Sequence, residues 1–231
     1  MALTCAPLAA SCSKDIFDVT VNLGAQTYSA NVGQQSGTVP TVTCDPAAPT
    51  TCTGGQAVDP NSTMVTTGPA TVGVSLSCDA ATVHCFAQAN VRVVYPVNVL
   101  QDDAFVAAVA QRSISLVRLA DLAYTVPVNT LTFEAPAVDV FAGPAGTALE
   151  TDPGVVSVGS TTPIPAGTPV TAAQHFTIAD GSPARALIEE SVQAEQPFVF
   201  VLTMGPRVEA GDAIPAGMFE VDLLPQVQLG F

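Results

Sequence analysis

Apolar and polar residues alternate along most of the chain, which is the pattern of β-strands with one buried face. In the segment LAYTVPVNTLTFEA, the apolar side chains of Leu122, Tyr124, Val126 and Val128 fall on one face. Comparable segments recur between turn-forming residues and number about ten. They are residues 16–23, 26–32, 72–78, 83–99, 122–135, 137–143, 155–159, 169–179, 197–204 and 218–231. This pattern predicts an all-β fold, an antiparallel β-sandwich with one or two short helices.

The first two predicted strands, residues 16–23 and 26–32, flank Gly24 and Ala25. A short link that contains glycine is typical of a β-hairpin, so we expect these two strands to pair with each other. Residues 45–70 are rich in proline and glycine. They predict an ordered excursion with little regular structure.

One short helix is predicted after Asp102 and Asp103, because either carboxylate can accept a hydrogen bond from a free N–H of the first turn. The apolar face of this helix comprises Phe105, Val106 and Val109. The segment that follows, residues 114–119, fits both the helical and the strand period. It is therefore open to either interpretation.

A second short helix is predicted from Pro183 to Ala194. Ser182 is placed as its N-cap, and Pro183 occupies the first helical position, where its missing N–H costs nothing. The buried stripe of this helix comprises Leu187, Ile188 and Val192. We expect Pro197 to end it.

The six cysteines form three close pairs within the first 85 residues: Cys5 and Cys12, Cys44 and Cys52, Cys78 and Cys85. The last two pairs enclose loops between strand-like segments, so nearest-neighbour disulfides across hairpins are expected. Disulfides imply an oxidising compartment. The alternatives are a metal site and free buried thiols. The chain has no CxxC spacing, which disfavours zinc.

The N-terminal segment ends in LAASC at Cys12, which is similar to a bacterial lipoprotein processing site. Lipidation of Cys12, giving an N-terminal anchor, is therefore an open alternative to its disulfide. No stretch of 18 or more apolar residues occurs, so no transmembrane segment is predicted.

Because every cysteine precedes residue 100, the chain can be divided there. Residues 1–100 would form a cysteine-containing β region with local disulfides, and residues 101–231 a β-sandwich region with short helices. One continuous domain, a single sandwich fed by both halves, is equally compatible with the pattern.

Charge excludes some classes of partner. The formal net charge is −14, and only 11% of the residues are charged, with six Lys and Arg that are never adjacent. Nucleic acid and anionic membrane surfaces need a basic patch, which this chain does not offer. A surface so poor in charge favours self-association or contact with another surface protein.

Catalytic motifs are missing from the sequence: there is no GxSxG, HExxH, GxxxxGK[ST] or GxGxxG. The two histidines are His84, beside a cysteine, and His175, in an alternating strand. Glu150 and Asp152 lie in a turn with Pro153 and Gly154, the best candidate for a calcium site. We expect neither an enzyme nor a cofactor.

Together these patterns predict a non-catalytic structural or cell-surface protein, extracellular or periplasmic, that self-assembles into an array or filament. The alternative is a surface binding module for a protein or lipid ligand on a β-sandwich scaffold. Such a module should show an apolar pocket or a large exposed apolar patch. An enzyme would need His175 to lie in a cleft beside a carboxylate and a hydroxyl.

Overall fold

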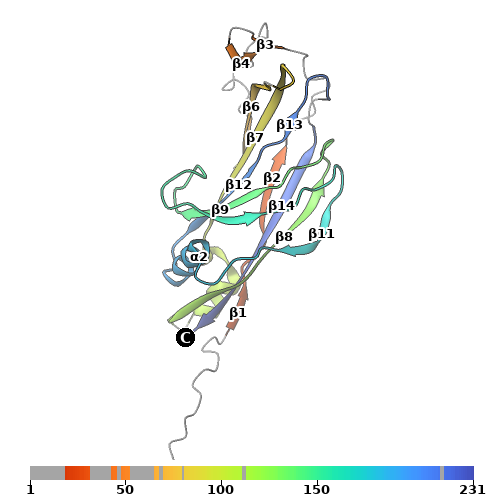
Figure 1. Cartoon of the computed structure of the whole chain (residues 1–231). Helices are drawn as coiled ribbons and strands as arrows, with labels where there is room; N and C mark the ends of the chain where they lie inside the picture. The colour runs from red at the N-terminus through yellow and green to blue at the C-terminus, as the bar shows by residue number, and fades with distance from the viewer. Residues whose placement is uncertain are drawn as a thin grey trace, which may run out of the picture.

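The computed structural model describes residues 19–31, 43–45, 48–52, 65–67, 70–79, 81–110, 113–213 and 216–231. Two antiparallel sheets pack face to face, so the predicted all-β sandwich is confirmed (Figure 1). The molecule is elongated, with β1 at one end and the small β3–β4 sheet at the other.

The first sheet has five strands in the order β1–β14–β8–β11, with β2 also paired to β14. They are β1 (Val19–Asn22), β2 (Gln26–Asn31), β8 (Leu116–Asn129), β11 (Val170–His175) and β14 (Met218–Gly230). β14 therefore lies at the centre of this sheet, although it is formed by the last residues of the chain. Of residues 114–119, open to either interpretation in the sequence, the last four form the start of β8.

The predicted hairpin of β1 with β2 is wrong. Both strands pair with β14, one after the other: Val19 lies opposite Leu229, and Asn31 opposite Met218. The N–H of Leu23 donates to the carbonyl of Pro225 at 3.0 Å, which continues the ladder between the two strands. Gly24 therefore interrupts one continuous edge of the sheet and does not form a hairpin turn. Pairing of β1 and β2 with the distant strand β14 is more favourable than pairing of the two neighbours with each other.

The second sheet has seven strands in the order β10–β9–β12–β7–β6–β5, with β13 also paired to β7. They are β5 (Val65–Thr67), β6 (Ala70–Asp79), β7 (His84–Val97), β9 (Asp139–Pro144), β10 (Val156–Ser160), β12 (Phe198–Met204) and β13 (Arg207–Val208). A separate two-stranded sheet is formed by β3 (Cys44–Asp45) and β4 (Ala48–Cys52).

The core lies between the two sheets. Along β14, the side chains of Phe219, Val221, Leu223, Val227 and Leu229 are all buried, as strand alternation requires. One buried cluster joins residues of both sheets, such as Tyr28 from β2 and Val93 from β7. Among the described residues both halves of the chain therefore build one core. The division of the chain near residue 100, and its alternative of one continuous domain, stay predictions.

Both predicted helices form. The helix α1 (Asp103–Val109) is capped by Asp102, whose carboxylate accepts from the N–H of Phe105 at 2.9 Å and from the N–H of Gly24 at 2.6 Å. Phe105 is fully buried, whereas Val106 is exposed. A short 3₁₀ helix, η1 (Val99–Gln101), precedes α1.

The helix α2 (Pro183–Gln193) begins as predicted, with Ser182 as N-cap accepting from the N–H of Arg185. Ile188 and Val192 are fully buried, and Leu187 is half-buried. This helix contacts β8 of one sheet and β9 and β10 of the other. It therefore closes one side of the sandwich.

Candidate functional site

The disulfides do not join nearest neighbours, so the predicted pairing is wrong. Cys44 is bonded to Cys78 and Cys52 to Cys85, with Cα separations of 5.5 and 6.1 Å. The predicted hairpins are real: Cys44 lies opposite Cys52 in the β3–β4 ladder, and Cys78 opposite Cys85 in the β6–β7 ladder. The two bonds therefore join one hairpin to the other. We call these four residues the cysteine quartet.

Geometry explains this pairing. Directly opposed residues of an antiparallel ladder hold their Cβ atoms about 4.5–5.5 Å apart, whereas a disulfide prefers about 3.8 Å. The cysteines of the two hairpins can come closer than this, because the β3–β4 hairpin is held against the turn of the β6–β7 hairpin by the hydrogen bond from the N–H of Cys44 to the carbonyl of Val83 at 3.1 Å and by the Thr43–His84 bridge. The bonds span 34 and 33 positions. They therefore close longer loops than the sequence suggested.

Cys78 and Cys85 lie next to the turn of the β6–β7 hairpin, and Cys44 and Cys52 lie in the β3–β4 sheet at the same end of the molecule (Figure 1). Beside the quartet, Arg207 of β13 forms ion pairs with Asp79 at 3.0 Å and with Glu209 at 2.5 Å, and lies 3.7 Å from the ring centre of Phe86. The N–H of Ala81 and the guanidinium of Arg207 hold the pKa of Asp79 below its usual value. This end of the molecule is thus fastened covalently and electrostatically.

Cys5 and Cys12 lie outside the described residues, so their disulfide and the lipidation of Cys12 stay predictions. Within the described residues, no helix is long and apolar enough to cross a membrane.

The calcium candidates, Glu150 and Asp152, lie in the loop after β9. Arg92 of β7 binds Glu150 through two hydrogen bonds, of 2.6 and 2.8 Å. Asp152 accepts from the backbone N–H groups of Ala148 and Leu149, and these bonds lower its pKa. Both carboxylates therefore have protein partners, and calcium would have to compete with them. Among the described residues, no cluster of three or more metal-ligating side chains occurs.

The two histidines lie on the surface. His84 is exposed at the start of β7, opposite Asp79. In β11, His175 Nδ1 lies 2.8 Å from Asp121 Oδ2, and 62% of the His175 side chain is exposed. His175 thus has a neighbouring carboxylate, but the pair stands in solvent.

The edges of the two sheets differ in how well they are protected against pairing with a further strand. Next to β8, the side chains of Arg185, Glu189 and Gln193 replace a neighbouring strand: Glu189 accepts from the N–H of Leu119 at 2.7 Å, and Arg185 donates to its carbonyl. Gln193 donates to the carbonyl of Ser115 at 3.0 Å. Sequence reasoning identified only the apolar stripe of α2. The polar spacing 185, 189, 193, one residue every helical turn, was the signal for this second contact.

Two other edges are interrupted by bulges. β11 pairs with β8 irregularly between Val170 and Gln174, and β10 pairs with β9 irregularly between Ser157 and Gly159. Bulges of this kind hinder the addition of a further strand.

Among the described residues, the edge strand β2 is neither bulged nor covered by a helix. In the part of the chain that the structure describes, it pairs with β14 alone. Its sequence, QTYSAN, holds no charge and no proline. On its solvent face, Thr27 donates to Asp222 at 2.6 Å and Ser29 to Glu220 at 3.0 Å. β2 is therefore a regular, uncharged edge, which is the candidate interface.

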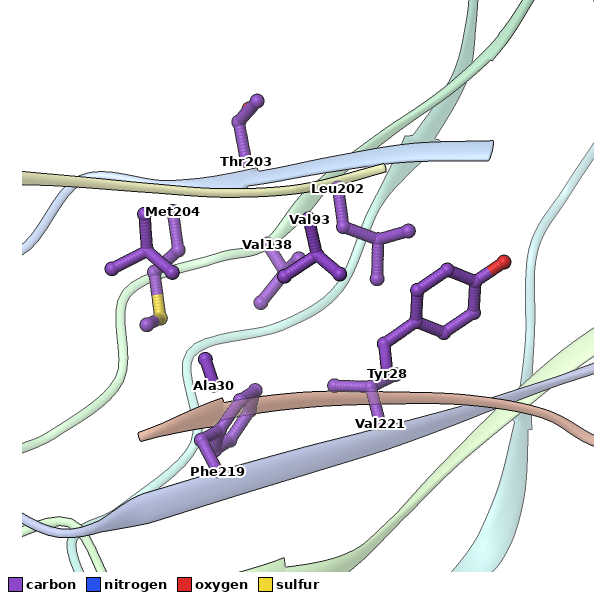
Figure 2. A pocket seen from close by; sticks show the side chains of 10 residues that line it. Tyr28, Ala30, Val93, Val138, Leu202, Thr203, Met204, Phe219 and Val221 are labelled. Carbon is purple, nitrogen blue, oxygen red and sulfur yellow. The ribbon is translucent and has the colours of Figure 1, made fainter. Parts of the chain in front are cut away.

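Behind β2 lies a small apolar hollow between the sheets (Figure 2). Tyr28, Val93, Leu202, Phe219 and Val221 are among the side chains around it. Its volume is about 20 Å³, room for about one water molecule, whereas small-molecule sites span about 300–1,000 Å³. The hydroxyl of Tyr28 is buried with no partner in the described structure, and burial raises the pKa of Tyr28. This hollow is a packing gap and not a ligand pocket.

Comparison of the chain with protein-family models, with curated proteins and with solved structures finds no match.

Proposed function

We propose that this protein is a non-catalytic extracellular or cell-surface structural protein that associates with further copies of itself through the edge of β2. The observation that carries the proposal is the contrast between edges: β8 is covered by side chains and β10 and β11 are bulged, whereas β2 is regular and uncharged. Natural sheets usually blunt an exposed edge with charge, proline or a bulge. An edge without these features can accept another strand.

The two disulfides support an oxidising location. Such bonds persist outside the cytosol, on cell surfaces and in the periplasm, and are rare in reducing compartments.

One substitution with a matched control tests the assembly. Asp222 is flanked in register by Thr27 on the edge and by Thr125 on the central strand β8. Thr27→Lys places a positive charge on the edge strand β2, beside the carboxylate of Asp222. Because the two charges are opposite, we expect the fold to tolerate the substitution. Thr125→Lys places the same cation beside the same carboxylate, away from the edge.

Sedimentation velocity over a concentration series is the measurement. We expect the parent protein to form larger species as concentration rises. Thr27→Lys should need a concentration at least about tenfold higher, equivalent to about 1.4 kcal/mol of association free energy. Thr125→Lys should behave as the parent does. A particle that stops at the dimer indicates two β2 edges paired with each other; continued growth indicates a filament or array.

A dissociation constant of about 1 mM corresponds to an association free energy of only about −4 kcal/mol. A parent protein that stays monomeric up to that concentration would therefore refute the assembly. Equal effects of both lysines would refute the role of β2. The alternative, a surface binding module, would need a pocket larger than the hollow of Figure 2.

A further inference from the structure

Each member of the cysteine quartet has two possible partners. The disulfides connect Cα atoms 5.5 and 6.1 Å apart. Residues opposed in an antiparallel ladder have Cα atoms about 4.5–5.5 Å apart, and disulfides span about 4.4–6.8 Å. The in-hairpin pairs, Cys44 with Cys52 and Cys78 with Cys85, therefore meet the Cα requirement of a disulfide, although the wider Cβ spacing of a ladder pair makes them the less favourable arrangement.

Accessibility differs within each bond. Cys44 and Cys85 are 5% and 1% exposed, whereas Cys52 and Cys78 are half-buried. Each disulfide thus joins one buried cysteine to one that is more exposed. An external thiolate reaches Cys78 more easily than Cys44, and its attack there releases the buried Cys44 as the leaving thiolate.

We infer that the quartet is a thiol–disulfide exchange site, at which a catalytic thiolate converts the cross-hairpin disulfides into in-hairpin disulfides. The external thiolate attacks Cys78 Sγ, forms a mixed disulfide and frees the Cys44 thiolate. Cys44 then attacks Cys52 Sγ of the second bond, closes Cys44–Cys52 and frees the Cys85 thiolate. Cys85 attacks Cys78 Sγ, closes Cys78–Cys85 and expels the external thiolate. Two disulfides exist before and after, so nothing is oxidised or reduced overall.

Exchange would unlatch the β3–β4 hairpin. In the present pairing both disulfides tie it to the β6–β7 hairpin, with help from a bond of 3.1 Å from the N–H of Cys44 to the carbonyl of Val83 and from the Thr43–His84 bridge. After exchange, each hairpin is closed by its own disulfide, and no disulfide of the quartet joins the two hairpins. We call the β3–β4 hairpin together with the turn of the β6–β7 hairpin the tip. The quartet thus gives the tip two covalent states that contain the same number of disulfides. This inference does not depend on the edge of β2.

The sequence offers a direct assay. A protease that cleaves before aspartate separates all four cysteines, into peptides 18–44, 45–58, 59–78 and 79–101. The oxidised full chain is incubated at pH 8 with substoichiometric 2-mercaptoethanol, and exchange is stopped by acid, because only the thiolate reacts. Free thiols are alkylated before the pH is raised for digestion, so that exchange cannot resume, and mass spectrometry then identifies the disulfide-linked peptides.

At time zero we expect 18–44 joined to 59–78 and 45–58 joined to 79–101. With thiol, 18–44 joined to 45–58 and 59–78 joined to 79–101 should appear in about 0.1–10% of the molecules, the range of a minor conformational state. In the same sample, hydrogen exchange at the amide of Cys44 should rise in proportion. The variant Cys44→Ser/Cys78→Ser keeps one cross-hairpin bond and should show no in-hairpin pair.

Two results would overturn the inference. Failure of peptide 59–78 to form a mixed disulfide means that the site is not reactive. A mixed disulfide without in-hairpin pairs above about 0.1% means that the second pairing is not accessible to the fold.

Discussion

Arg92 and Glu150 fasten the loop after β9 to the middle of the second sheet. The guanidinium holds both carboxylate oxygens, and the two side chains are only 27% and 28% exposed. The hydrogen bond from Arg92 lowers the pKa of Glu150, and the bond to Glu150 raises the pKa of Arg92. A carboxyl whose pKa is lower in the folded than in the unfolded chain stabilises the fold above its unfolded pKa, and this stabilisation is lost as the pH falls.

Glu150→Gln removes this pH-dependent stabilisation. At pH 7 we expect the variant to lose about 1 kcal/mol of unfolding free energy, the upper end for a partly exposed ion pair. The difference should shrink below about pH 4.3, the usual pKa of glutamate, and vanish when Glu150 is protonated in both states. Urea unfolding at a series of pH values measures it. Glu195→Gln, an exposed position, removes the same charge as a control; an equal loss there would contradict the role of the pair.

At the scale of elements, α2 acts as a surrogate strand for β8. Arg185 and Glu189 are held to each other at 2.9 Å, and both bind the backbone of Leu119. Gln193 extends this contact to Ser115. The backbone groups that an edge strand would leave exposed are therefore occupied by one helix.

Glu189→Ala takes the acceptor away from the N–H of Leu119. A buried donor left without a partner costs about 1–3 kcal/mol, so we expect that loss in urea unfolding, with faster hydrogen exchange at the Leu119 amide. The neighbouring Glu190 is exposed on the same helix. Glu190→Ala should change neither quantity; an equal change in both variants would show that the helix itself, and not this contact, was weakened.

Local signals predicted the elements well but not their partners. Ser182, Pro183 and Asp102 mark helix starts through contacts within a few residues, which a sequence displays directly. The partner of β2 lies almost 200 positions away, and alternation says that a strand exists without saying what it pairs with. The quartet shows the same limit: the sequence indicated hairpins, whereas the disulfides depend on how two hairpins stack.

At the scale of the whole molecule, the buried core cluster between the sheets and the disulfide-bonded tip are separate regions. The buried cluster between the sheets contains none of the four cysteines, although Cys44 and Cys85 are themselves buried. Disulfides that close loops of this length contribute about 3–4 kcal/mol in the loop-entropy description. That stabilisation acts on the tip rather than on the sandwich.

Full reduction with excess dithiothreitol should therefore release the tip and leave the sandwich folded. In hydrogen exchange we expect the amide of Cys44 to lose protection, while the amides of β12, such as Phe200 and Leu202, keep theirs, because stability differs between regions. Simultaneous loss in both regions would show that the tip and the sandwich unfold as one unit.

The position of β14 has a consequence for biosynthesis. β2 ends at Asn31 and β14 starts at Met218, so at about 5–20 residues per second the ribosome delivers the partner of β2 about 10–40 s after β2 itself. The five-stranded sheet can close only after β14 has been synthesised. A nascent polypeptide that has not reached Met218 would keep its first strands available to a chaperone or an export channel.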